Sequence, residues 1–285
     1  MKYKIIKKIN KGMSKDIKYI VYLPEKKEKA ILRINGFSPE KEKYYVNIKK
    51  IYENIPSGSL ITFEIINDKI YSFFKFIDGS SLKSILILSS SDKQYKYGVM
   101  AGKLLSKIHN AKVFTSIVCS NKYYIDYVLK KYSQFQYKND VIDNLFAFCK
   151  KNTEKINLEK CNVLNADYKI DNIIFNKGKL YIVDLEKYEF GDPLRDFTFM
   201  YTYNENKTFA KGMIDGYIKC SPVLDKDDFF CRFKFYTMIS MVQYYMWCYK
   251  IYGHEHDSIM ISKECIRDFS YGDIPLWYEK INYEV

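Results

Sequence analysis

Three polar side chains in the middle of the chain have the types and the spacing that phosphoryl transfer needs. Asp167 and Asn172 are five residues apart, and Asp184 follows twelve residues later, at the end of an apolar run that begins at Lys179. One carboxylate can orient an attacking hydroxyl and accept its proton, while an amide and a second carboxylate can hold Mg²⁺ on the phosphates. We therefore expect Asp167 and Asn172 to be catalytic, and Asn172 and Asp184 to bind the metal.

The elements around these residues would place them at the ends of strands. Residues 160–164 and 173–175 are short β-type runs on either side of the loop that carries Asp167. The strand 179–184 can pair with the second of these runs through the turn 176–178. An aspartate and an asparagine at this spacing are common by chance, and loop carboxylates often only cap turns. The strands on both sides favour the functional interpretation.

The residues after Asp184 point to a family. Asp184-Leu185-Glu186 is followed by Gly191-Asp192-Pro193-Leu194-Arg195-Asp196-Phe197. This order resembles the aminoglycoside phosphotransferase and choline kinase-like family, whose members carry an H-G-D-x-x-x-x-N loop, an I-D-x-(D/E) metal strand and a G-D-P-x-x-D-(L/F) continuation. The resemblance implies that Glu186 is a further metal residue. We expect Asp192 and Asp196 to be structural, tying the loop after the strand and capping the next helix.

The chain departs from the family pattern just before Asp167. Asn165 and Ala166 stand where the family usually has His-Gly. Asn165 can still donate and accept hydrogen bonds, so the departure puts the rate in doubt more than the activity. A catalytically degraded, nucleotide-binding relative is the alternative of another class, although Asp167, Asn172 and Asp184 are all retained.

Similar but weaker matches occur near the start of the chain. Residues 9–16 resemble the family's phosphate loop, with Gly12 and Ser14 as cofactor-binding residues, although a single glycine also fits a plain hairpin turn. Arg33 stands where the family's more familiar lysine would reach the phosphates, and a guanidinium can bind phosphate oxygens bidentately. Glu42 lies three residues before Tyr45 and is expected to share its inward face and to pair with Arg33.

The surrounding pattern predicts an α+β, bilobal protein kinase-like fold. Residues 1–78 alternate like a five-stranded antiparallel sheet, and Ser38 and Pro39 predict the start of one inserted helix. We expect this N-terminal lobe to bind the nucleotide, and residues 79–285 to form a mainly helical lobe for catalysis and acceptor binding. Helices are predicted at 95–109, 121–136, 139–156, 196–203, 208–218 and 226–252. His109, at the end of the first of these helices, is expected to bond to the catalytic region.

Composition excludes several other classes of protein. The net charge of +12 arises from lysines spread along the chain, with no recognisable nucleic-acid module, so we expect no nucleic-acid partner. The basic balance should instead favour polyphosphates. The longest uncharged stretch, 235–249, is too short to span a membrane. Seven cysteines without C-x-x-C spacing, and no cleavable signal at the N-terminus, indicate a reduced, cytoplasmic chain.

The resemblance implies ATP or GTP with Mg²⁺ as cofactors and a small hydroxyl-bearing acceptor, in a monomer or dimer. An aminoglycoside acceptor would need an acidic pocket, for which the chain offers Glu186, Glu189, Asp273, Glu279 and Glu284. A choline-like acceptor would need an aromatic cage, for which it offers Tyr244, Tyr245, Trp247 and Trp277, although core packing is the more frequent role of such residues. The sequence leaves the acceptor, the nucleotide base and the oligomeric state open.

Overall fold

The computed structural model describes residues 1–10, 16–53, 55–112, 119–156, 159, 161–185, 188–202, 206–220 and 225–281. The chain divides into two compact units that each draw on separate stretches of sequence. The first, here called the sheet unit, comprises Met1–Ile85, Ala111–Phe114 and Asp171–Lys187. The second, the helical unit, comprises Leu86–Asn110, Thr115–Ile170 and Tyr188–Val285.

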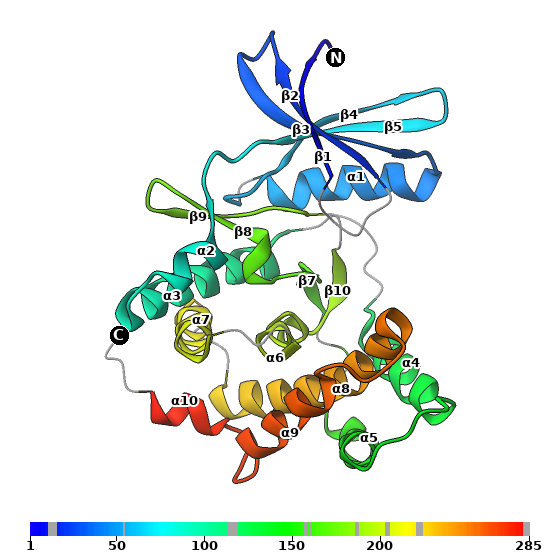
Figure 1. Ribbon diagram of the computed structural model, residues 1–285, viewed down its shortest axis with the longest axis vertical. Helices are drawn as coiled ribbons and strands as arrows, with labels where there is room; N and C mark the ends of the chain where they lie inside the picture. The colour runs from blue at the N-terminus through cyan, green and yellow to red at the C-terminus, as the bar shows by residue number, and fades with distance from the viewer. Residues whose placement is uncertain are drawn as a thin grey trace. The chain divides into compact units, whose positions relative to one another are not determined.

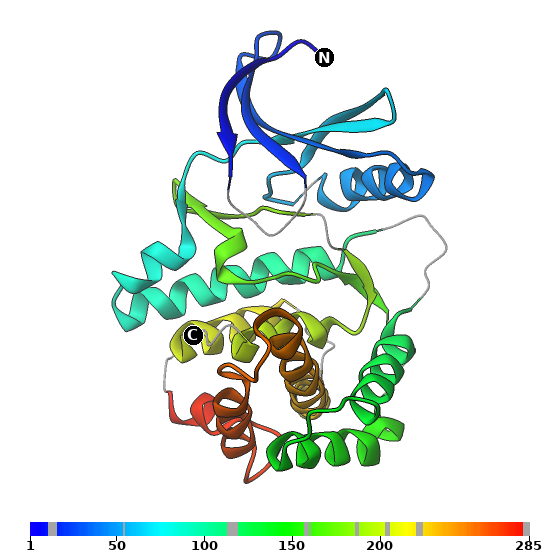
Figure 2. The same ribbon diagram turned by 45° about the vertical axis from the view of Figure 1, so that its right-hand side comes forward.

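A five-stranded antiparallel sheet forms the centre of the sheet unit (Figures 1 and 2), as the alternating sequence predicts. Its spatial order is β1-β2-β3-β5-β4. One face buries Val21, Leu23, Ala30, Leu32 and Phe73 as a small core. The strands are β1 (Lys4–Ile9), β2 (Ile17–Leu23), β3 (Glu28–Gly36), β4 (Leu60–Ile66) and β5 (Lys69–Lys75).

One helix, α1 (Pro39–Tyr52), is inserted between β3 and β4 and lies along the sheet (Figure 1). Its start is where the sequence predicts it, because the Ser38 hydroxyl accepts a hydrogen bond from the Lys41 backbone nitrogen at 3.3 Å. Its inward stripe packs on the sheet, with the Tyr45 ring 5.6 Å from the Phe63 ring. The buried positions are Tyr45, Ile48, Ile51 and Tyr52.

A second, three-stranded sheet also belongs to the sheet unit and has the order β6-β8-β9. The strands are β6 (Ser80–Ser81), β8 (Ile173–Asn176) and β9 (Lys179–Ile182). Lys177 and Gly178 join β8 to β9 with φ values of 46° and 80°, the left-handed conformation that a tight two-residue hairpin requires. Hydrogen bonds from Gly58 N to Ile182 O (2.8 Å) and from Ile182 N to Pro56 O (3.1 Å) tie β9 to the segment before β4. Residues 173–176 pair with residues 179–182, as predicted, but the strand ends at Ile182, two residues before Asp184.

Helices dominate the helical unit, together with a short antiparallel pair of strands, β7 (Asn162–Leu164) and β10 (Glu189–Gly191). The predicted 226–252 helix is confirmed as α8, with Asp225 accepting from the backbone nitrogens of Asp227 and Asp228. The predicted 196–203 helix is instead the short turn η3 followed by α6, because Asp192 and Pro193 start the helical turn earlier. The two C-terminal helices were not predicted. The helices are α2 (Leu82–Ile87, at the junction of the units), α3 (Ser91–His109), α4 (Asn121–Ser133), α5 (Asp140–Asn152), α6 (Phe199–Thr202), α7 (Lys207–Lys219), α8 (Lys226–Tyr252), α9 (Ser258–Asp268) and α10 (Leu276–Lys280), with 3-10 turns η1 (Thr153–Lys155), η2 (Ile170–Asn172) and η3 (Pro193–Phe197).

Two helices of this unit, α3 and α7, pack backbone against backbone (Figures 1 and 2). A Cβ added to Gly102 would lie 2.0 Å from the Met213 carbonyl oxygen, and one added to Gly212 would lie 2.2 Å from the Tyr95 carbonyl oxygen. Only residues without a side chain permit so close an approach. The contact fixes α3, the helix that ends at His109.

The predicted α+β fold class is confirmed, with a five-stranded antiparallel sheet in one unit and mainly helices in the other. Within the described part of the chain, no helix combines the length and the apolar character that crossing a membrane would require.

Candidate active site

Asp167 lies in the helical unit, on the loop that follows β7. Its carboxylate is buried, and Lys169 places its ammonium nitrogen 3.2 Å from Asp167 Oδ1. The backbone nitrogen of Lys169 also donates to the Asp167 carbonyl oxygen at 2.9 Å, which closes the loop into a tight turn. A buried carboxylate is costly unless it is paired, so Lys169 offsets part of the cost of keeping Asp167 ionised.

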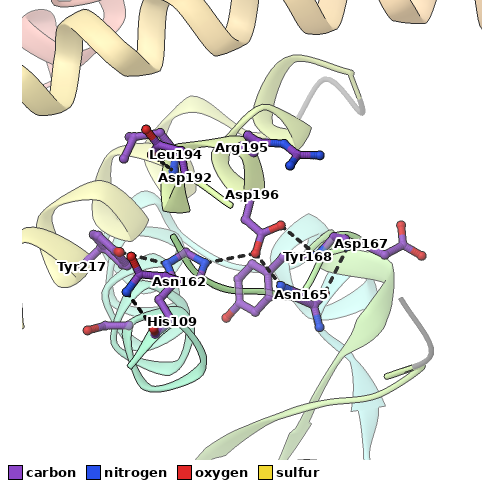
Figure 3. A network of polar contacts seen from close by, with 12 residues as sticks. His109, Asn162, Asn165, Asp167, Tyr168, Asp192, Leu194, Arg195, Asp196 and Tyr217 are labelled. Atoms are coloured by element: carbon purple, nitrogen blue, oxygen red, sulfur yellow. Dashed lines mark hydrogen bonds and ion pairs between the residues drawn. The ribbon is translucent and has the colours of Figure 1, made fainter. Parts of the chain in front are cut away.

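The Asp196 side chain binds the backbone of this loop through two hydrogen bonds (Figure 3). Asp196 Oδ2 accepts a hydrogen bond from the Asn165 backbone nitrogen at 2.7 Å, and Oδ1 accepts one from the Ala166 backbone nitrogen at 2.9 Å. Asp196 is itself buried in η3. Its structural role is as predicted, but it binds the catalytic loop, and the capping role belongs to Asp192, which accepts from the Leu194 backbone nitrogen.

His109 supports Asp196 from the opposite side (Figure 3). Its Nε2 lies 3.0 Å from Asp196 Oδ2, and its Nδ1 lies 2.8 Å from the Tyr217 hydroxyl. A carboxylate only accepts hydrogen bonds, so His109 Nε2 carries a proton and donates it to Asp196. Burial raises the pKa of Tyr217, and the charges of Asp192 and Asp196 raise it further, so the Tyr217 hydroxyl stays protonated. The expected link between His109 and the catalytic region is confirmed, and it passes through Asp196.

The two departures from the family pattern have local structural consequences. Ala166 has φ 58°, a left-handed conformation that glycine adopts freely and alanine adopts at a cost of about 1–2 kcal/mol. Asn165 is buried, and its Oδ1 accepts a hydrogen bond from the Asp167 backbone nitrogen at 3.3 Å. The amide therefore supports the loop at the position where the family usually has histidine.

Asn172 and Asp184 both lie in the sheet unit, beside the β8–β9 hairpin. Asn172 is buried at the end of η2, and its carbonyl oxygen accepts a hydrogen bond from the Val183 backbone nitrogen at 2.8 Å. This bond places Asn172 next to the residue that precedes Asp184. Asp184 has φ 59° and a side chain that is 43% exposed. An amide and a carboxylate oxygen are suitable ligands for Mg²⁺, which proteins bind through one or two carboxylates together with substrate phosphates.

Arg33 projects from β3 toward the same hairpin, in the sheet unit. Its side chain is 6% exposed, and Nη1 donates to Asp184 Oδ1 at 2.8 Å. Nη2 donates to Asp16 Oδ2 at 2.9 Å. Asp16 entered the sequence analysis only as the last residue of the 9–16 segment, and its pairing with Arg33 was not predicted.

The predicted pairing of Arg33 with Glu42 is wrong. Glu42 is exposed on α1, and within the described ranges it forms no ion pair with Arg33. At about 100° per residue, Glu42 lies roughly 110° around the helix from the centre of the buried stripe. The spacing of three residues from Tyr45 is therefore not enough to turn its side chain inward.

Some of the other residues predicted for the site lie outside the described residues: Gly12, Ser14, Glu186 and Glu284. Of the remaining acids, Glu189 pairs with Arg195 at 2.6 Å and Asp273 with Lys234 at 3.1 Å, while Glu279 is exposed on α10.

The four aromatic residues suggested for a cage do not form a single cluster. Tyr244 stacks on Trp247 at 5.7 Å, whereas Tyr245 is buried and Trp277 donates to the Tyr201 hydroxyl at 2.9 Å. Among the residues whose placement is described, no ring contact joins Trp277 to the other three. Trp277 therefore belongs to the core.

The model of the phosphotransferase enzyme family, APH, matches residues 6–230, which is more than half of the chain. The chain belongs to this family. The match includes Asp167, Asn172 and Asp184, the three residues expected to be catalytic or to bind the metal. Comparison with curated proteins finds no match by sequence.

Solved structures of small-molecule kinases share the fold. A thermostable mutant of the aminoglycoside phosphotransferase APH(4)-Ia, in ternary complex with ADP and hygromycin B, has TM-score 0.65 and 11% identity, covering 92% of each chain. The amicoumacin kinase hAmiN, in complex with AMP-PNP, Ca²⁺ and Ami, has TM-score 0.67 and 11% identity, covering 97% of this chain and 92% of that one. Choline kinase from Cryptosporidium parvum Iowa II has TM-score 0.65 and 13% identity, covering 96% and 92%. At these identities the likeness establishes the fold of a small-molecule kinase, not its acceptor.

Proposed function

We propose that this phosphotransferase moves the γ-phosphate of ATP or GTP to a hydroxyl group of a small molecule, and that an aminoglycoside-type antibiotic is that molecule. The observation that carries the proposal is the fixed, buried position of the Asp167 carboxylate. Its carboxylate is buried beside Lys169, on a loop whose two preceding backbone nitrogens are both bound by Asp196. A general base needs this kind of fixed position more than it needs an unusual environment.

In this mechanism Asp167 orients the acceptor hydroxyl and takes its proton as the oxygen attacks the γ-phosphate. The bond from the γ-phosphorus to the β–γ bridging oxygen breaks, and the nucleoside diphosphate leaves with its electron pair. Lys169 stays beside Asp167 and limits the cost of its charge in a buried site. Arg33 contacts the phosphate oxygens from β3, where its guanidinium already binds one carboxylate of the metal strand. Asn172 and Asp184 would hold Mg²⁺, with Glu186 as a further metal residue. The bound metal would neutralise charge on the phosphates.

Each of the two predicted lobes would bind one of the two substrates. We propose that residues 1–78 bind the nucleotide, with Gly12 and Ser14 at its phosphates, and that residues 79–285 supply the base and the acceptor site. We also propose a cytoplasmic location, since all seven cysteines are free thiols, and a monomeric or dimeric state without nucleic-acid or membrane partners.

A choline-like or other metabolite acceptor is the second candidate. The stacked pair Tyr244 and Trp247, with Trp247 37% exposed, offers an aromatic surface that a quaternary ammonium could use. Glu189, whose side chain is 46% exposed beside Arg195, offers instead a carboxylate for an amine-rich acceptor. Alanine at Trp247 would weaken binding of the first kind of acceptor, and glutamine at Glu189 would weaken binding of the second.

The decisive experiment is a nucleotide-consumption screen with ATP or GTP and Mg²⁺ against aminoglycosides, macrolides, choline, homoserine and sugars. We expect turnover with one acceptor class and loss of turnover in Asp167→Asn, which keeps the side-chain shape but removes the base. A thermal shift with Mg²⁺ and nucleotide, but no turnover with any acceptor, would favour the degraded nucleotide-binding relative. No shift with either triphosphate would rule out both readings.

A further inference from the structure

Arg33 is shared between two carboxylates that come from different parts of the sheet unit. Nη2 donates to Asp16, immediately before β2, and Nη1 donates to Asp184, beyond β9. The exposed fractions of the side chains are 6% for Arg33, 21% for Asp16 and 43% for Asp184. The pair with Asp16 is therefore the better shielded of the two contacts.

Helix α1 presents a different group to this face of β3. Side chains alternate along a strand, so Arg33 and Asn35 lie on the same face. The Tyr45 hydroxyl of α1 accepts a hydrogen bond from Asn35 Nδ2 at 2.7 Å and lies 3.4 Å from the hydroxyl of Ser72, the residue paired with Arg33 on β5. Where α1 contacts β3 it thus contributes a tyrosine hydroxyl, and its acids Glu40 and Glu42 are exposed.

We propose that Asp16 is the counter-ion that positions Arg33 for the phosphates of the nucleotide, in the role that a carboxylate from α1 was expected to fill. This inference rests on the proposed function. In the sequence, Asp16 is the last residue of the 9–16 segment that resembles a phosphate loop, so the ion pair links the end of that segment to the cation on β3.

The same arrangement gives a physical reason for arginine at this position. A guanidinium has two terminal nitrogens in a fixed plane, so one can stay on Asp16 while the other faces Asp184 and an incoming phosphate. A lysine ammonium is a single point of charge, which could not keep both partners in these directions. Asp16 therefore orients Arg33, and the two terminal nitrogens of Arg33 allow it to keep Asp16 while it faces Asp184 and the phosphate.

Loss of the Asp16 carboxylate should mainly weaken nucleotide binding. Without the Asp16 carboxylate, the buried guanidinium keeps its desolvation cost but loses the charged partner of Nη2. Arg33 would then lean toward Asp184 and withdraw that carboxylate from the metal. We expect Asp16→Asn to raise the KM for the nucleotide by about tenfold or more, the usual scale for a charged hydrogen bond, and to leave the KM for the acceptor unchanged.

The test compares four single variants in the whole protein with the acceptor found by the screen. Asp16→Asn should raise the nucleotide KM, and Asp16→Glu should recover part of the loss because the carboxylate is retained. Glu25→Gln is the matched control, since it removes the same charge from the exposed turn at the other end of β2. Glu42→Gln tests the competing counter-ion on α1. An effect of Asp16→Asn no larger than that of Glu25→Gln, or a larger loss in Glu42→Gln, would overturn the inference.

A second measurement detects the ion pair without any substrate. In a double-mutant cycle of unfolding free energy, Asp16→Asn and Arg33→Gln together should cost less than the sum of the two single losses. Additive losses would contradict the pair itself. Failure of the wild type to bind nucleotide would instead remove the proposed function, whereas a wild type that binds and an Asp16→Asn variant that is unaffected would remove only this inference.

Discussion

Asp196 Oδ2 lies 2.7 Å from the backbone nitrogen of Asn165, a residue 31 positions earlier in the chain. The other carboxylate oxygen bonds the next backbone nitrogen, that of Ala166. The Asp196 side chain thus binds the backbone of the two residues that precede Asp167, the proposed base. Such a grip does not depend on the identity of the side chains at 165 and 166, which gives a physical reason why these two positions can depart from the family pattern.

The first prediction tests this grip. Asp196→Asn keeps one oxygen acceptor but sets an amide N–H₂ against one backbone donor, so a buried N–H loses its partner. We expect a loss of about 1–3 kcal/mol in the free energy of unfolding, measured by urea denaturation, together with a lower kcat. Asp225→Asn is the control, because Asp225 also accepts from two backbone nitrogens, but at an exposed helix start where asparagine caps equally well. Equal losses in the two variants would show that Asp196 has no special hold on the loop.

Local signals in the sequence were enough to predict most of the fold. Ser38 and Asp225 cap helices where expected, and the apolar alternation located all five strands of the main sheet. The helices α2 and α10 were missed because they are only six and five residues long, and α9, which has 11 residues and follows Asp257, was missed as well. The predicted 226–252 helix has a signal at each end in the structure, the Asp225 cap at its start and Gly253 with φ 79° after its last residue.

The polar partners were harder to predict than the elements. The three residues at kinase spacing could be named, because their types and order carry the information. The partners of Arg33 were not named. Asp184 is 151 positions away in the sequence, and Asp16, although it precedes the strand paired directly with β3, can be placed beside Arg33 only once the β2–β3 register is known. Glu42 was chosen by helical periodicity alone, which places a residue on a face only to within a fraction of a turn.

The second prediction separates the roles of two aspartates. Asp167→Asn should leave nucleotide affinity nearly unchanged and lower turnover by about two to four orders of magnitude, the scale of general-base catalysis. Asp184→Asn should weaken metal-supported nucleotide binding itself, because the lost charge faces the cation. Calorimetric titration of each variant with Mg²⁺ and nucleotide, beside its kcat, would distinguish them. The assignment fails if both lose the same affinity, or if Asp167→Asn keeps full turnover.

The third prediction concerns the left-handed backbone at Ala166. Glycine there relieves about 1–2 kcal/mol of strain but gives back about 0.5–1 kcal/mol through the freer unfolded chain. We expect Ala166→Gly to be neutral or more stable by up to about 1.5 kcal/mol, and Ala166→Val to be less stable by more than about 1 kcal/mol, since a β-branched residue is a poor fit at positive φ. Thermal unfolding of the three proteins measures the order. A valine variant as stable as the glycine variant would show that the loop has relaxed from φ 58°.

The fourth prediction concerns the contact between α3 and α7, which supports the catalytic loop at a distance. Gly102→Ala would place a Cβ 2.0 Å from the Met213 carbonyl oxygen, so the two helices must separate. Such overpacking against backbone should cost about 3 kcal/mol, at the upper end of the usual range. Gly272→Ala is the matched control, because no atom lies within 4 Å of its added Cβ.

The Gly102→Ala substitution should also lower kcat. The Ala101 carbonyl oxygen, next to Gly102, accepts a hydrogen bond from the Tyr168 hydroxyl at 2.7 Å, and Tyr168 follows Asp167 directly. His109, at the end of the same helix, bonds Asp196 behind the loop. A shift of α3 therefore moves two supports of Asp167 at once, and kcat should fall in Gly102→Ala at temperatures where the variant is still folded. A Gly102→Ala protein that is as stable and as active as Gly272→Ala would mean that α3 and α7 are not in backbone contact.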